Sequence, residues 1–285
     1  MTSLGPLLRR TQRQLESAGI GDAPIEADLI WMTALEIDRA ELYARLSDVP
    51  SSSEAETATS LLDRRLRHEP AAYIMGKREF YGLELIVAPG VLVPRPDTET
   101  LVEEALRIVD KRGLTAPHIA DVGCGSGAIS IALAVHLPKA TLHAIDISPR
   151  AIEITEDNAA RHLVQERVHP VLGDLLVPLT RLVDLITANL PYVMSWEIPT
   201  LEPEIRMFEP REALDGGDDG LDIVRRLLTQ APGHLAPGGT VLLEVDPRQI
   251  ASVSAFAAAS LPGATVRTVR DLAGRERVVV VETSK

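Results

Sequence analysis

The chain has almost no cysteine and no long apolar run. Its 285 residues include one cysteine, Cys124, so an intrachain disulfide is impossible and a reducing compartment is indicated. No run approaches the roughly 18 apolar residues of a membrane-spanning helix. The basic residues near the N-terminus are not followed by an apolar stretch of signal-peptide length. These absences predict a soluble, cytoplasmic protein without a membrane partner.

A dense basic cluster is also missing. The 41 acidic residues outnumber the 29 lysines and arginines, which gives a formal net charge of −12. An acidic surface repels phosphates, so the charge argues against direct binding of nucleic acid. The densest basic run, residues 64–68, has the composition of the solvated C-terminal end of a helix.

Residues 1–72 contain no strand pattern. Apolar residues at helical spacing between Leu4 and His68 predict four helices, which would form a small bundle. Ser51 and Glu54 have the spacing of a capping box at the start of the last helix. The bundle carries eight arginines, no lysine and twelve acidic residues spread as surface charge, so its composition indicates no chemistry of its own.

Residues 73–96 differ in composition from the bundle and read as a linker. Two β-rich runs lie on either side of Pro89-Gly90, which predicts a hairpin that turns at this dipeptide. The chain has only three phenylalanines, and Phe80 stands beside Tyr81; we expect the hairpin to pack these aromatics between the domains. Asp97-Thr98-Glu99 is predicted to cap a helix that runs through Asp110.

Strands and helices alternate over residues 97–285, which form the third segment. This alternation predicts an α/β fold with a mostly parallel sheet and helices on both faces. The last two strands are joined by a short turn and should form an antiparallel pair at one edge. A dinucleotide-binding sheet is six-stranded and parallel, whereas this pattern predicts seven strands. They are expected at His118–Val122, Thr141–Ile145, Val168–Leu172, Val183–Ala188, Thr240–Val245, Thr265–Val269 and Arg277–Val281.

The first of these strands leads into a glycine-rich turn, Asp121-Val122-Gly123-Cys124-Gly125-Ser126-Gly127. Glycines there let the backbone approach a ligand closely. The turn alone could serve a dinucleotide, a phosphate or an adenosyl sulfonium. No Lys-Ser/Thr pair follows the glycines, which argues against a nucleoside triphosphatase. Within the turn, Cys124 is interpreted as a small filler side chain.

Acidic residues at the ends of the next two strands narrow the choice of ligand. Asp146 lies 19 residues beyond Gly127, about the offset at which a carboxylate meets a ribose diol. After the third strand, Asp174 can accept a hydrogen bond from an exocyclic amine, and Leu175 can cover an aromatic ring. Together with the glycine turn, these residues predict an adenosyl pocket without a diphosphate site.

The fourth strand ends at Asn189-Leu190-Pro191-Tyr192. The Asn189 side chain offers one carbonyl acceptor, and the Leu190 main chain offers a second. Pro191 stiffens the turn and favours an extended conformation at Leu190. Tyr192 adds a flat apolar face. Two acceptors side by side suit an NH₂ group attached to a planar system.

In this order, the glycine turn, the ribose acid and Asn-x-Pro-Tyr resemble the class I S-adenosylmethionine-dependent methyltransferases. Within these, the chain resembles the release-factor glutamine methyltransferases (the PrmC/HemK family) over nearly its whole length. The resemblance includes residues 89–99 (Pro-Gly-Val-Leu-Val-Pro-Arg-Pro-Asp-Thr-Glu), Phe208-Glu209-Pro210, Ala213-Leu214, Gly216-Gly217, Asp219-Gly220 and the Asp271-x-x-Gly274-x-x-Arg277 pattern.

This resemblance implies a function and a cofactor. The side-chain amide nitrogen of the glutamine in the Gly-Gly-Gln motif of class I peptide chain release factors would be methylated with S-adenosylmethionine. The helical domain and the hairpin would hold the release factor, and no metal is implied. Catalysis is expected from Asn189, Leu190, Pro191 and Tyr192. Cofactor binding is expected from Asp121, Gly123, Cys124, Gly125, Ser126, Gly127, Asp146, Asp174, Leu175 and Asn189.

The sequence departs from the family at two places, and two other functions remain open. Leu190 stands where the family usually has proline, and Asn-Leu-Pro-Tyr is more familiar in rRNA adenine dimethyltransferases. The family's usual glycine is missing after Leu243-Glu244, although Gln249 is retained. The first alternative is an adenine methyltransferase acting on RNA or DNA. The second is a non-enzymatic cofactor-binding partner of release factors or ribosomes.

Overall fold

The computed structural model describes residues 2–284. They divide into two compact units. One comprises the residues up to Gly76 together with Glu202–Phe208, and the other comprises Lys77–Leu201 and the residues from Glu209 onward. None of the described helices is long and apolar enough to cross a membrane.

The first unit is a helical bundle, as expected from the sequence. Its core gathers fully buried residues such as Leu15, Ile30 and Leu42. The predicted capping box is confirmed, because Ser51 Oγ accepts from Glu54 N and Glu54 Oε2 accepts from Ser51 N. The helices are α1 (Leu4–Ser17), α2 (Ala23–Leu35), α3 (Arg39–Ala44), α4 (Ser52–Leu66), α5 (Ala71–Met75) and α9 (Pro203–Phe208).

Helix α9 joins this unit from far along the sequence. Arg65 on α4 is 5% exposed, and its guanidinium forms ion pairs with Glu26 on α2 and Glu204 on α9. The buried side chain of Arg65 therefore links α2 and α4, which are close in sequence, to α9, which lies about 140 residues after Arg65. No periodicity in the sequence indicated that this segment belongs with the N-terminal helices.

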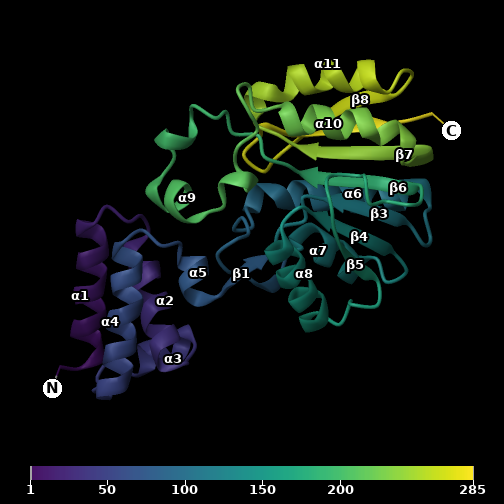
Figure 1. The fold of residues 1–285 in the computed structure, drawn as a ribbon. Coiled ribbons are helices and arrows are strands. Elements are labelled where there is room, and N and C mark those ends of the chain that lie inside the picture. The colour runs from purple at the N-terminus through teal and green to yellow at the C-terminus, as the bar shows by residue number, and fades with distance from the viewer. Residues whose placement is uncertain (1, 285) are drawn as a thin grey trace. The chain divides into compact units, whose positions relative to one another are not determined.

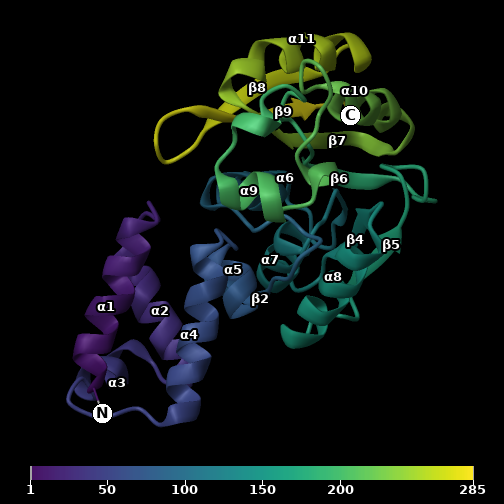
Figure 2. The same cartoon turned by 60° about the vertical axis from the view of Figure 1, so that its left-hand side comes forward.

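A seven-stranded sheet forms the centre of the second unit (Figure 1). The strand order is β5-β4-β3-β6-β7-β9-β8. Only β9 runs antiparallel to its neighbours β7 and β8, which confirms the expected edge pair. The strands are β3 (His118–Val122), β4 (Thr141–Asp146), β5 (Val168–Leu172), β6 (Val183–Asn189), β7 (Leu235–Glu244), β8 (Thr265–Arg270) and β9 (Glu276–Glu282). Figure 2 shows the β8–β9 connection as a yellow loop beyond the strand ends.

Helices cover both faces of this sheet. One face packs under α6 (Glu99–Arg112), α7 (Ala128–His136) and α8 (Pro149–Arg161), and the other packs under α10 (Asp222–Gln230) and α11 (Ile250–Ser260). Neighbouring residues of β9 pack on opposite faces of the sheet: Val280 lies in the core under α6 and α7, and Val281 lies in the core under α10 and α11. Five short 3₁₀ helices complete the fold: Pro96–Thr98, Ile198–Thr200, Arg211–Ala213, Ala231–Gly233 and Pro247–Gln249.

The hairpin expectation was wrong in its position. The hairpin consists of β1 (Lys77–Phe80) and β2 (Leu83–Ile86), and it turns at Tyr81-Gly82 instead of Pro89-Gly90. Both turn residues have positive φ, +52° and +72°, which matches the twist of a tight two-residue hairpin. Residues 73–75 are helical. Phe80 is 1% exposed and packs in the core of the second unit, so it is not the interdomain residue that we expected.

Candidate active site

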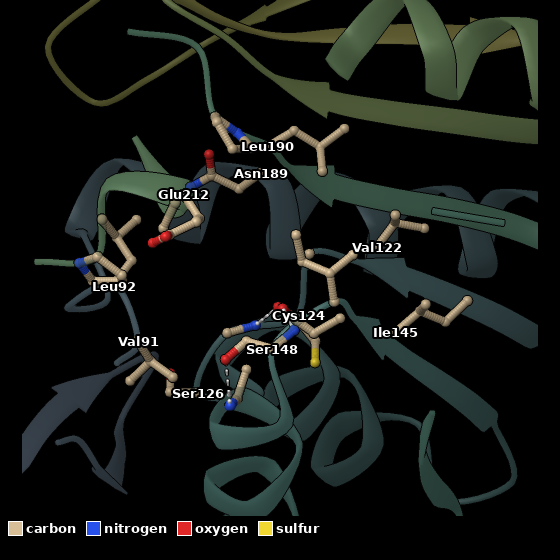
Figure 3. A pocket seen from close by; sticks show the side chains of 18 of the residues that line it. Val91, Leu92, Val122, Cys124, Ser126, Ile145, Ser148, Asn189, Leu190 and Glu212 are labelled. Atoms are coloured by element: carbon tan, nitrogen blue, oxygen red, sulfur yellow. Dashed lines mark hydrogen bonds between the residues drawn. The ribbon is translucent and has the colours of Figure 1, made fainter. Parts of the chain in front are cut away.

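A cavity of about 500 Å³ opens at the carboxyl ends of β3, β4, β5 and β6. Ligands of open α/β sheets bind at this edge. Ten of the residues expected at the site line it: Gly123, Cys124, Gly125, Ser126, Asp146, Asp174, Leu175, Asn189, Leu190 and Pro191. In Figure 3, Cys124, Ser126 and Ser148 lie on one side of its open centre, and Asn189, Leu190 and Glu212 lie on the other. Asp121, Gly127 and Tyr192 do not line it.

The glycine turn needs glycine at each of its three positions. Gly123, Gly125 and Gly127 have φ of +73°, +57° and +79°, a region that side chains disfavour. A Cβ at Gly127 would approach Thr155 Cγ2 to 2.9 Å, and one at Gly123 would approach Leu190 Cδ2 to 3.0 Å. A Cβ at Gly125 would meet no protein atom within 4 Å. The backbone at Gly125 therefore borders open cavity.

Asp146 is fixed at the end of β4 by two main-chain donors. Its Oδ2 accepts from Gly125 N at 2.9 Å, and its Oδ1 accepts from Ser148 N at 2.9 Å. Burial raises the pKa of this carboxyl, and the main-chain hydrogen bonds oppose the rise. Each oxygen keeps a further acceptor direction for a hydroxyl group of a ligand.

Asp121 lies behind the turn and outside the cavity. It is fully buried, and it accepts from the Ser130 main chain and hydroxyl at the start of α7 and from the Thr187 hydroxyl on β6. Burial raises its pKa to about 6, opposed by these hydrogen bonds. Asp121 thus ties β3 to α7 and β6 beneath the glycines. Cys124 is also buried, which raises the pKa of its thiol and keeps it protonated.

Asp174 and Leu175 line the end of the cavity beyond β5. Asp174 forms an ion pair with Arg226 of α10, and Arg226 lines the cavity too. Leu175 is 5% exposed and has a φ of +52°. Sequence reasoning missed Arg226, because a partner from a distant helix leaves no spacing pattern.

Asn189 is the last residue of β6. Its Nδ2 donates to Thr98 Oγ1 at 3.1 Å, and its Oδ1 accepts no hydrogen bond from residues 2–284. The side-chain acceptor of Asn189 is therefore available to a ligand. Leu190 is 4% exposed and packs against Gly123, whose missing Cβ makes room for the longer side chain.

The main chain after Pro191 is clamped by the glycine-containing loop of residues 209–220. Val193 N donates to Leu214 O and Gly216 N donates to Val193 O, each at 2.9 Å. Gln249 Nε2 donates to Tyr192 O at 2.9 Å. The Tyr192 side chain lies outside the cavity, where burial raises its pKa to about 12. These contacts hold the backbone of Tyr192 and Val193 in place, and Pro210, Glu212 and Ala213 of the same loop line the cavity.

Two family models and several curated proteins match this chain. The family described as PrmC N-terminal domain matches residues 6–76, and the methyltransferase small domain family matches residues 98–200. A release factor glutamine methyltransferase from Geobacter sulfurreducens is 41% identical over 85% of this chain and 84% of its own length. One from Moorella thermoacetica is 38% identical over 96% of both chains.

The chain belongs to the release factor glutamine methyltransferase family. It is therefore a methyltransferase. A solved methyltransferase from Pyrococcus furiosus shares the fold, with a TM-score of 0.54 at 16% identity over 78% of this chain and 99% of the other.

Segments that carried the family resemblance meet in space beside the cavity. Arg95 pairs with Glu209 at 2.6 Å, which joins the Pro-Arg-Pro and Phe-Glu-Pro segments. Arg277 of β9 pairs with Asp97 at 2.7 Å, and this joins the Pro-Asp-Thr-Glu and Asp-x-x-Gly-x-x-Arg segments. In this methyltransferase, ion pairs thus connect motifs that are far apart in the sequence.

The expected cap at Asp97-Thr98-Glu99 is confirmed in position, because Thr98 is the N-cap residue of α6, but no side-chain cap hydrogen bond forms. None of these side chains caps α6; Asp97 pairs with Arg277, Thr98 accepts from Asn189, and Glu99 Oε1 accepts from Tyr81 N at 2.9 Å. Thr98 and the acidic Glu212 line the cavity, and sequence reasoning missed both. Among residues 2–284, no group of three or more His, Cys, Asp or Glu could hold a metal ion.

Proposed function

We propose that this chain methylates the side-chain amide nitrogen of the glutamine in the Gly-Gly-Gln motif of class I release factors, with S-adenosylmethionine as methyl donor. Family membership supports the substrate class. The observation that carries the proposal is the unengaged Oδ1 of Asn189 at the cavity, next to the glycine turn. Together with the Leu190 carbonyl, an acceptor held there suits an NH₂ group, which has two hydrogens to donate, better than a hydroxyl, which has one, or a carboxylate, which has none.

The cavity fits the proposed cofactor. Its volume lies within the range of about 300–1,000 Å³ that small-molecule sites occupy. Asp146 would accept from the ribose hydroxyls, the open backbone at Gly125 would border the methionine portion, and Leu175 would cover the adenine. When bound, S-adenosylmethionine supplies an electrophilic methyl group on its sulfonium.

The residues at the end of β6 would orient the substrate. An amide nitrogen is a poor nucleophile because its lone pair is delocalised into the carbonyl. Asn189 Oδ1 and the Leu190 carbonyl would accept its two hydrogens, hold the nitrogen in place and stabilise the positive charge that develops on it. No strongly basic residue is required, because the methylated amide loses its proton readily.

The direct test is incubation with labelled S-adenosylmethionine. We expect transfer of label to a purified class I release factor and none to the same factor with alanine in place of the Gly-Gly-Gln glutamine. A parallel reaction with ribosomal RNA tests the adenine methyltransferase alternative. Label in RNA, or equal label in both forms of the release factor, would contradict the proposal.

A second prediction concerns cofactor affinity. Asp146→Asn removes the carboxylate charge but keeps the size of the side chain, and we expect the Kd for S-adenosylmethionine to rise about tenfold, as when a charge-assisted hydrogen bond of about 1.4 kcal/mol is lost. Isothermal titration calorimetry measures this. Asp157→Asn, in an exposed position on α8, is the matched control and should leave Kd unchanged. An unchanged Kd for Asp146→Asn would reject the ribose role.

A further inference from the structure

Thr98 and Glu244 lie behind Asn189, and the proposed mechanism gives neither a role. Thr98 ends the 3₁₀ turn before α6 and is 4% exposed. Glu244 ends β7, is 2% exposed, and stands directly opposite Asn189 in the β6–β7 register. A carboxyl group is therefore buried one strand away from the proposed catalytic amide.

The three side chains are placed so that two hydrogen bonds can run from Asn189 through Thr98 to Glu244. Thr98 Oγ1 accepts from Asn189 Nδ2 at 3.1 Å, so the single hydroxyl proton of Thr98 is free for another acceptor. The buried Glu244 carboxyl is the acceptor at hand: Thr98 lowers the Glu244 pKa, as a donor to the carboxylate does, and Glu244 Oε2 has no hydrogen-bond partner among the described residues. An ionised carboxylate can only accept, so it fixes the direction of both hydrogen bonds.

We propose that the Thr98 hydroxyl donates to the Glu244 carboxylate, and that these two positioning residues thereby hold the Asn189 amide with Nδ2 toward Thr98 and leave Oδ1 for the substrate. The inference rests on the proposed function, because it assigns a purpose to the free Oδ1. A carboxamide has nearly the same shape when its nitrogen and oxygen exchange places, so shape alone does not select one orientation. Without the carboxylate, the Thr98 hydroxyl can donate to Oδ1 and stabilise the reversed amide.

The charge state of Glu244 makes this arrangement sensitive to pH. Burial raises the Glu244 pKa to about 7. Thr98, Arg277 and Arg95 favour the ionised form, whereas Asp97 opposes it. The buried Tyr192 ring also faces Glu244, whose charge contributes to the raised Tyr192 pKa. Glu244 is ionised above its pKa, so the productive amide orientation is favoured above about pH 7 and lost below it.

The first experiment compares Thr98→Val with Thr98→Ser. Valine keeps the shape but removes the hydroxyl, and we expect kcat for release-factor methylation to fall about tenfold, equivalent to roughly 1.4 kcal/mol. The Kd for S-adenosylmethionine should stay the same. Thr98→Ser keeps the hydroxyl and should recover most of kcat. If Thr98→Val lowers the thermal unfolding midpoint but keeps kcat, or if serine fails to rescue, the positioning role is wrong.

The second experiment does not depend on activity. The chain has two asparagines, Asn158 and Asn189, so asparagine-selective ¹⁵N labelling gives two side-chain amide signals, and Asn189→Ala assigns them. We expect the Asn189 signal to titrate with a midpoint near pH 7 in the wild type and to stay flat in Glu244→Gln. Asn158 is the internal reference, because its amide is held by the Ile86 and Ser126 main chains.

A flat Asn189 signal in the wild type would overturn the inference, whatever the substrate. Absence of methyl transfer from the wild type to release factors would instead reject the proposed function. The two failures are therefore distinguishable. A titration that persists unchanged in Glu244→Gln would assign the ionisation to another group and would also overturn the inference.

Discussion

Asn189→Ala is expected to lower kcat for release-factor methylation by about 10²–10³-fold, the usual cost of removing one preorganised polar group from a transition-state site. Asn189 Oδ1 is the side-chain acceptor proposed to hold the substrate NH₂, and alanine provides none. The Kd for S-adenosylmethionine should change by no more than about twofold, because Asp146 and the glycine turn are intact. Single-turnover methylation and calorimetry measure the two quantities separately.

The matched control for this variant is the neighbouring residue. Leu190→Pro keeps the main-chain carbonyl, which is the second proposed acceptor, and introduces the residue that the family usually has. We expect turnover to be retained. Undiminished turnover in Asn189→Ala, or an equal loss in both variants, would contradict the assigned role of the Asn189 side chain. A shared loss of cofactor affinity would indicate that the whole segment had been displaced.

Gly220→Ala is expected to destabilise the methyltransferase unit by about 3 kcal/mol, from backbone strain and steric overlap together. Gly220 has a φ of +75°, and an added Cβ would lie 2.2 Å from Tyr192 O and 2.3 Å from Gln249 Nε2. Both atoms belong to the clamp behind Asn-Leu-Pro-Tyr. Relief of the overlap requires movement of the Tyr192 main chain, so we expect methylation to fall as well.

Thermal unfolding followed by circular dichroism measures the loss of stability. The unfolding midpoint falls by roughly 2–4 °C for each kcal/mol lost in proteins of comparable size. Gly233→Ala is the matched control, because a Cβ there would meet no atom within 4 Å and φ is not in the positive range. Its unfolding midpoint should stay within about 2 °C of the wild type. Equal behaviour of the two variants would contradict the clamp.

The sheet could be predicted from the sequence because its signals are local. Strands such as β3 and β5 begin and end where their apolar runs do, and the short β8–β9 turn allows only an antiparallel pair. The position of the hairpin was predicted wrongly because that prediction also relied on a local signal. Pro89-Gly90 is a strong turn signal, but the residues after it line the cavity instead of pairing, and Tyr81-Gly82 adopts the positive φ values.

The site was predicted unevenly. Asp146 and Asn189, the last residues of β4 and β6, were predicted at the cavity and line it, because the carboxyl ends of parallel strands share one edge; Ile147, which follows Asp146, also lines it and was missed. Asp121 was also expected at the cavity, but its side chain is fully buried beneath the glycine turn. Successive side chains of a strand point to opposite faces, and this alternation directs Asp121 away from the cavity. Tyr192 was expected at the cavity but does not line it; its main-chain carbonyl accepts from Gln249 Nε2.

By itself, the sequence determined the class of fold and predicted the glycine turn, Asp146 and Asn-Leu-Pro-Tyr at the strand ends, because each of these is a property of consecutive residues. Only the tertiary structure decided that Thr98 and Glu244 stand behind Asn189, that Arg277 reaches Asp97, and that α9 joins the N-terminal helices. These partners are separated by tens to nearly two hundred residues. Hydrogen bonds and ion pairs over such separations depend on where the chain returns in space, and no local pattern encodes that.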